Sequence, residues 1–179
     1  SRAFVKEDSA DDADALPERP LPAHANYVTT RGLAQLQVRV RELAGTCETL
    51  RRGAVDDTDA RQQLRAAERD MRYYSAQLER AELVTPASQH HDSDSSDGSN
   101  ESRDGIRIRF GASVAFLDEG GVEHTVRIVG DDEADAPAGY ISWASPLARA
   151  LIGARVGDAV TWRRPAGTAE IEILRVEYA

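Results

Sequence analysis

The chain has 179 residues, a formal net charge of -9 from 22 basic and 31 acidic side chains, and a single cysteine, Cys47. The acidic surplus argues against the concentrated Lys/Arg surface that wrapping nucleic acid requires, so a protein partner is favoured. One cysteine excludes an internal disulfide and a cysteine zinc cluster, and no apolar run approaches the roughly 20 residues that span a bilayer. We therefore expect a soluble, cytoplasmic protein without a cofactor.

The first 25 residues are expected to form a flexible acidic arm. They carry 3 basic and 6 acidic side chains, and Pro17, Pro20 and Pro22 interrupt them. Neither helical nor strand periodicity is present, and the composition offers little to bury.

Residues 26–85 are predicted to form an antiparallel coiled-coil hairpin with its tip at about residues 53–59. Two series of apolar residues recur at alternating spacings of 3 and 4, which is typical of a heptad seam. The first series is Leu33, Leu36, Val40, Leu43, Cys47 and Leu50, and the second is Leu64, Ala67, Met71, Tyr74, Leu78 and Ala81. At 1.5 Å per residue the hairpin should reach about 35 Å.

Residues 86–105 are rich in Ser and Asp and are predicted to be a linker. The pair His90-His91 lies in this segment, where nothing preorganises a metal site, so we expect no specific metal binding there.

Residues 106–179 are predicted to form a small, mostly antiparallel sheet with one short helix, which makes the whole chain an α+β protein. Alternating apolar residues mark the strands, and Gly120-Gly121 marks a hairpin turn. Ser145 is suited to cap the helix, Pro146 to be its first residue and Gly153 to end it.

Several motifs of this segment, in the same order, resemble the C-terminal domain of the GreA/GreB (Gre-type) bacterial transcription elongation factors. They are Phe110-Gly111-Ala112, the run from Ile128 to Asp135, the run from Ser145 to Gly153, Val156-Gly157-Asp158 and Ile171-Glu172-Ile173. Asn26-Tyr27-Val28-Thr29, at the start of the hairpin, resembles the family as well. The resemblance implies a domain of FK506-binding-protein-like (FKBP-like) fold that grips the rim of the RNA polymerase secondary channel while the hairpin enters that channel.

The resemblance also implies a polymerase-docking surface made by an acidic loop and the start of the short helix. Its candidate residues are Asp131, Asp132, Glu133, Asp135, Ser145, Pro146, Leu147 and Arg149. An exposed Pro-Leu step flanked by acids would supply an apolar anchor with a charged rim. A solvated turn is the alternative interpretation of the acidic loop, and Trp143 belongs either to this surface or to the core.

At the tip, the sequence departs from the family pattern. Family members that stimulate transcript cleavage carry Gly-Asp-x-x-Glu-Asn there, and its two carboxylates help to hold a second metal ion at the polymerase active centre. Here the tip offers Asp56, Asp57 and Asp59 without that signature. Each arm is also about one heptad shorter than the family pattern, which withdraws the tip by roughly 10 Å.

Two roles therefore remain open for the tip aspartates. They either reach the active centre, holding metal only within the polymerase complex, or they stabilise the start of the second helix, where Asp59 and Gln62 have capping-box spacing.

The resemblance, together with the altered tip, implies a monomeric regulator, not itself an enzyme, that binds RNA polymerase and acts by occupying the secondary channel. Contact with the transcript 3′ end would be indirect, and cleavage stimulation weak or absent. The alternatives are a true cleavage-stimulating factor that uses the tip aspartates, a peptidyl-prolyl isomerase and a coiled-coil adaptor.

Overall fold

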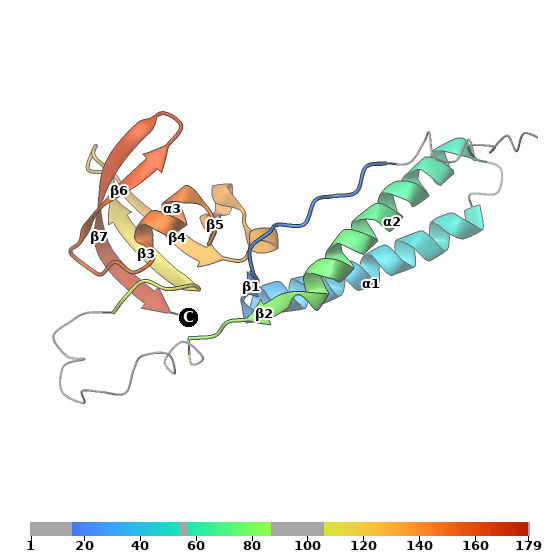
Figure 1. The fold of residues 1–179 in the computed structure, drawn as a ribbon, viewed down its shortest axis with the longest axis horizontal. Coiled ribbons are helices and arrows are strands. Elements are labelled where there is room, and N and C mark those ends of the chain that lie inside the picture. Colours follow the sequence, from blue (N-terminus) through green and yellow to red (C-terminus); the bar gives the residue numbers. More distant parts are fainter. Residues whose placement is uncertain (1–15, 54–56, 87–105, 179) are drawn as a thin grey trace, which may run out of the picture. The chain divides into compact units, whose positions relative to one another are not determined.

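The computed structural model describes residues 16–53, 57–86 and 106–178, and the fold is α+β (Figure 1). The chain divides into two compact units. The first unit comprises Ser1–Ala23 and Gln37–Glu79, and the second comprises His24–Leu36 and Arg80–Ala179. The base of the hairpin is thus grouped with the C-terminal sheet. None of the helices in the described ranges is long and apolar enough to cross a membrane.

The hairpin consists of helices α1 (Thr30–Gly53) and α2 (Thr58–Glu79). In α1 the predicted seam is confirmed, because between Leu36 and Leu50 only the seam positions escape exposure. Cys47 is the most buried of them, at 0% exposure, as expected for a small apolar residue in a core. Near the tip, Arg51 Nη2 of α1 donates to Glu68 Oε1 of α2 at 2.7 Å.

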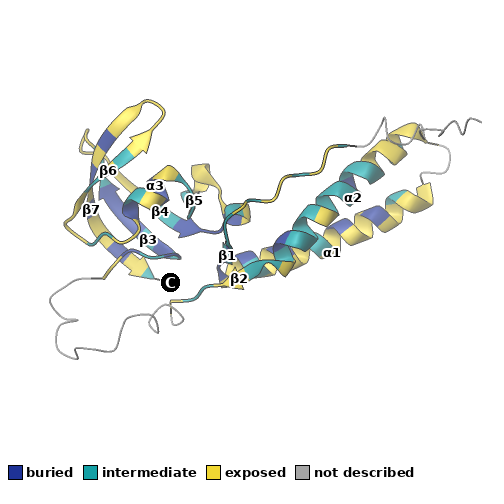
Figure 2. Cartoon of the chain, in the orientation of Figure 1, coloured by how far each residue is buried: buried dark blue, intermediate teal, exposed yellow. Residues whose placement is uncertain are grey.

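Helix α2 is covered much more widely than α1. From Leu64 to Leu78 only Arg72 is exposed, and Figure 2 shows most of α2 as partly buried while α1 alternates between buried and exposed. A helix that met only one partner along a heptad seam would leave its outer half exposed. A second side of α2 must therefore be covered as well.

Two short strands close the base of the hairpin. Strand β1 (Asn26–Val28) pairs in parallel with β2 (Ala81–Leu83), and the Val84 N–H donates to the Val28 carbonyl at 3.0 Å. The segment that enters the hairpin and the segment that leaves it therefore lie side by side.

The second unit contains a five-stranded sheet in the order β5-β4-β3-β7-β6. Its strands are β3 (Ala112–Leu117), β4 (Glu123–Val129), β5 (Tyr140–Ser142), β6 (Ala159–Arg164) and β7 (Gly167–Tyr178). All neighbours are antiparallel except β4 and β5. The prediction of a mostly antiparallel sheet is confirmed.

Helix α3 (Pro146–Leu151) forms as its local sequence predicts. The Ser145 side chain accepts a hydrogen bond from the Ala148 N–H at 3.2 Å, and Pro146 occupies the first turn, where its missing N–H has no cost. Gly153 follows with φ 91°, a left-handed conformation that glycine adopts without strain. Leu151 is fully buried and anchors the helix to the core.

Candidate functional site

A hollow of about 1070 Å³ lies on the sheet of the second unit. Strands β3, β4, β5, β6 and β7 contribute to it, together with the turn η3 (Ala136–Ala138) and the start of α3. Phe116, Trp162 and Ile171 are among its apolar lining residues. The hollow can therefore accept apolar side chains of a partner without first exposing the domain core.

Polar groups at the hollow are held in place by aromatic residues. The His124 ring stacks on Phe116 with ring centroids 5.4 Å apart, and its Nε2 lies 2.8 Å from Asp118 Oδ2. This hydrogen bond, with those from the Val122 and Gly120 N–H groups, lowers the pKa of Asp118. The guanidinium of Arg164 lies 5.5 Å from the centre of the Trp162 ring.

The start of α3 brings three of the candidate docking residues to this hollow. Ser145, Pro146 and Leu147 all line it. Pro146 is exposed, whereas Leu147 is 8% exposed and packs into the core below. Arg149, one turn further along α3, is exposed. Of the Pro-Leu step that was expected to be exposed, only Pro146 is thus presented at the edge of the hollow, with the charged Arg149 one turn away, because the Leu147 side chain is part of the core.

The acidic run divides into exposed and internal carboxylates. Asp131, Asp132 and Glu133 form the turn η2 (Asp131–Glu133), and Asp135 precedes η3, which lines the hollow. Asp132 and Asp135 are exposed. Asp131 is engaged within the unit, because it accepts a hydrogen bond from the Ser142 hydroxyl and lies 2.7 Å from His24 Nε2.

Glu133 is 7% exposed, and its carboxylate is occupied from the base of the hairpin. It accepts hydrogen bonds from the Thr29 N–H at 3.1 Å, the Thr29 hydroxyl at 2.5 Å and the Gly130 N–H at 3.2 Å. A Cβ at Gly32 would lie 2.2 Å from Glu133 Cδ, so only glycine fits beside this carboxylate. Glu133 therefore joins α1 to the sheet within the second unit and is not part of an exposed acidic surface.

Trp143 lies against the same base. Its ring centroid is 4.8 Å from that of Tyr27 and 5.2 Å from that of His24, and Tyr27 also packs on Phe110. Among the described residues, its indole Nε1 is buried without a hydrogen-bond partner. Trp143 is thus part of the packing between the hairpin base and the sheet.

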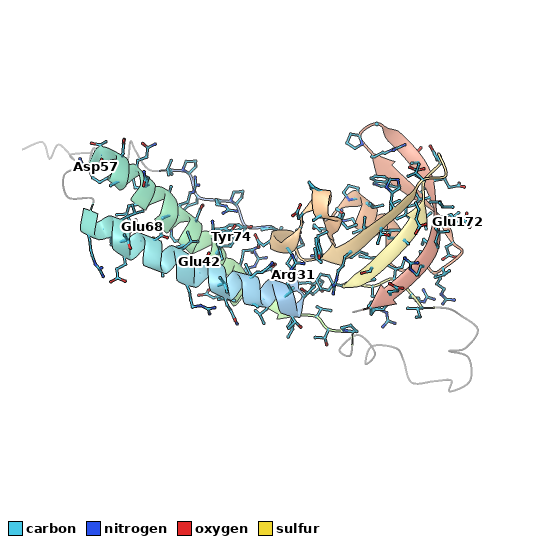
Figure 3. All side chains as sticks on the ribbon, turned by 180° about the vertical axis from the view of Figure 1, so that it is seen from behind. Arg31, Glu42, Asp57, Glu68, Tyr74 and Glu172 are labelled. Carbon is cyan, nitrogen blue, oxygen red and sulfur yellow. The ribbon has the colours of Figure 1, made fainter. Side chains whose placement is uncertain are left out.

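The tip aspartates lie at the start of α2. Figure 3 labels Asp57 beside the start of α2. Asp57 and Asp59 are exposed, and the Asp59 N–H donates to Asp57 Oδ1 at 2.9 Å. Asp57 thus acts as a local cap for the first turn of α2. Asp56 lies outside the described residues. Within the described ranges, no group of three or more His, Cys, Asp or Glu side chains is arranged to hold a metal ion.

Comparison with known proteins shows which family model and which proteins this chain is similar to. Residues 103–178 match the family model described as "Transcription elongation factor, GreA/GreB, C-term". The chain is 42% identical to transcription elongation factor GreB of Neisseria meningitidis serogroup B over 118 residues, which are 66% of this chain and 64% of that protein. It is 51% identical to transcription elongation factor GreA of Agrobacterium fabrum over 75 residues, which are 41% of this chain and 48% of that protein.

The chain therefore matches less than two thirds of the length of these relatives. Among solved structures, it is similar to GreA factor homolog 1 (Gfh1) of Thermus thermophilus, with 23% identity, a TM-score of 0.39, and coverage of 86% of this chain and 99% of that one. Residues 103–178 are thus similar to the C-terminal domain of the GreA/GreB transcription elongation factors, and the similarity to GreB extends over 118 residues of the chain.

Proposed function

We propose that this protein binds bacterial RNA polymerase and regulates transcription elongation from the secondary channel. One observation carries the proposal: the Ser145-Pro146-Leu147 step of the family motif opens onto the apolar hollow of the sheet domain. An apolar centre with a polar rim is the usual composition of a protein-binding surface. FKBP-like topology remains our expectation for this domain.

The charges around the hollow indicate what the partner surface should offer. Asp132 and Asp135 are exposed on one segment, and Arg149 is exposed on α3. We propose that an apolar group of polymerase enters the hollow while side chains of opposite charge meet this rim. The rim would then mainly determine the association rate and its salt dependence.

The substitution Pro146→Glu tests the docking surface. Glutamate is favourable in the first turn of a helix, so α3 should be retained, but a carboxylate is placed at the apolar hollow. We expect the affinity for core polymerase to fall about tenfold or more, a loss of at least about 1.4 kcal/mol. Equilibrium binding to labelled core polymerase measures it.

Leu174→Glu is the matched control. Leu174 is 36% exposed on β7, and its side chain alternates with the buried Ile173 and so faces away from the hollow. Glu172, labelled in Figure 3, marks the same outer side of β7. Equal losses of affinity in Pro146→Glu and Leu174→Glu would contradict docking through the hollow.

We further propose that the hairpin acts by occupancy and contributes no catalytic group of its own. This is supported by the tip, where Asp57 serves as a cap for α2 and the Glu-Asn pair of cleavage-stimulating relatives is absent. On backtracked complexes, the factor should leave the rate of transcript cleavage near that of polymerase alone. Rapid release of short 3′ fragments, lost when Asp56, Asp57 and Asp59 are changed to Ala, would establish the cleavage-stimulating alternative instead.

A further inference from the structure

Residues 16–23, expected from the sequence to belong to a flexible arm, lie on helix α2 as an extended segment that we name the strap (Figure 1). Two of its side chains pair with α2. Glu18 Oε1 accepts hydrogen bonds from Arg72 Nη2 at 2.5 Å and from Arg72 Nε at 3.1 Å. Arg19 Nη1 lies 3.4 Å from Asp70 Oδ1.

The guanidinium of Arg19 also lies on an aromatic surface. Its Cζ is 3.8 Å from the centre of the Tyr73 ring and 5.0 Å from the centre of the Tyr74 ring. The two rings pack edge to face, with centroids 5.1 Å apart. Figure 3 labels Tyr74 on α2, on the side along which the strap runs. A planar cation between ring faces and a carboxylate makes a specific contact, which a surface ion pair alone would not.

The proline-rich sequence of the strap favours the extended backbone that this contact requires. Pro17, Pro20 and Pro22 have a fixed φ, and each proline disfavours helical backbone in the residue before it. The strap is therefore extended before it docks, and docking orders few additional backbone angles. Proline-rich segments bind aromatic surfaces of other proteins in the same way.

The burial of α2 agrees with a ligand on this face. Between Leu64 and Leu78 every residue except Arg72 is at least partly buried, although a heptad seam alone would leave the outer half of the helix exposed. Arg72 itself pairs with the strap. Around residues 70–74, the strap thus contributes to the cover of α2.

We propose that Asp70, Arg72, Tyr73 and Tyr74 form a binding site for an extended, proline-flanked Glu-Arg segment, and that the strap is its ligand within the same chain. The hairpin is then a three-element unit of α1, α2 and strap. Its outer surface includes the strap residue Leu21, which is 42% exposed. Any partner that surrounds the hairpin meets the strap on this side of α2.

A spin label on the strap tests the proposal in the full chain without polymerase. A nitroxide is attached at Leu21→Cys, since Leu21 is exposed whereas the native Cys47 is fully buried. Amide NMR signals of α2 are then compared with the label oxidised and reduced. We expect selective broadening of signals from residues 70–76, and its loss in Arg19→Ala and in Tyr73→Leu.

Arg41→Ala is the matched control, because Arg41 is an exposed arginine on α1, and this variant should keep the broadening. Arg19→Ala changes only the strap, so a loss of broadening there cannot result from an unfolded hairpin. The proposal is overturned if the parent chain shows no broadening of α2, or if broadening persists in either Arg19→Ala or Tyr73→Leu.

Discussion

At the scale of single residues, Tyr178 holds the last strand against the beginning of the sheet domain. Its hydroxyl accepts a hydrogen bond from the Arg109 N–H at 2.9 Å and donates one to the Arg107 carbonyl at 2.6 Å. Tyr178→Phe removes both bonds, so we expect the free energy of unfolding to fall by about 1 kcal/mol. Thermal unfolding measures it, with a shift of about 4 to 8 °C for a domain of this size.

The same hydroxyl should make stability depend on pH in the alkaline range. Burial raises the pKa of Tyr178 above its ordinary value of 10.0, while the Arg109 N–H hydrogen bond and charge partly oppose the shift. The folded state favours the protonated hydroxyl, so its contribution is complete below pH 10 and is lost as pH rises through the raised pKa. Tyr178→Phe should lack this loss, so the stability advantage of the parent over the variant should shrink as pH rises above 10. A stability difference that stays constant across this range would refute the assignment.

At the scale of elements, two glycines in α1 should respond oppositely to the same substitution. Gly32→Ala places a Cβ 2.2 Å from Glu133 Cδ and must displace a buried carboxylate that holds Thr29, so we expect a loss of about 1 to 3 kcal/mol. A Cβ at Gly45 meets nothing within 4 Å, so Gly45→Ala should add about 0.5 to 1 kcal/mol through helix propensity. Urea unfolding of both variants measures the difference.

Each glycine variant is the control for the other, because both change the same helix by one methyl group. Stabilisation by Gly32→Ala would mean that the Glu133 carboxylate moves away freely and does not fix α1 to the sheet.

The sequence predicts those elements whose signals come from neighbouring residues. The seam through Leu43 and Cys47 follows from spacing alone, and the capped helix at Ser145 follows from three adjacent residues. The bond from Thr29 to Glu133 spans 104 positions, and that from Arg19 to Asp70 spans 51. No local pattern reports such pairings, since each side chain alone is typical of a solvated surface.

The hollow and the acidic run also divide into a part that the local sequence predicts and a part that it does not. The helix start that lines the hollow was identified from its motif, whereas the hollow depends on side chains from five strands spread between Phe116 and Ile171. The acidic residues between Asp131 and Asp135 cannot be told apart by their local sequence, yet the fold buries Glu133 and exposes Asp135. Chain direction and register decide which carboxylate faces inward, and composition carries no information on either.

At the scale of the whole molecule, the hollow and the hairpin tip belong to different compact units, so binding and regulation should be separable. Pro146→Glu acts at the hollow and should raise the concentration of factor that gives half its effect on elongation. At saturation the maximal effect should be unchanged, because the hairpin is intact. The reverse is expected for Asp57→Ala with Asp59→Ala, which removes the cap from the first turn of α2 and alters the tip alone. A loosened tip fills the channel less well, so the maximal effect should fall at unaltered affinity.

Titration of each variant into a paused elongation assay measures both quantities. The combined variant should show both changes independently, since substitutions at distant sites without shared partners are additive. A tip variant that weakens binding as strongly as Pro146→Glu would show that the hairpin contributes directly to affinity. The hollow would then be one of two anchors, and the occupancy of the channel would itself hold the factor on polymerase.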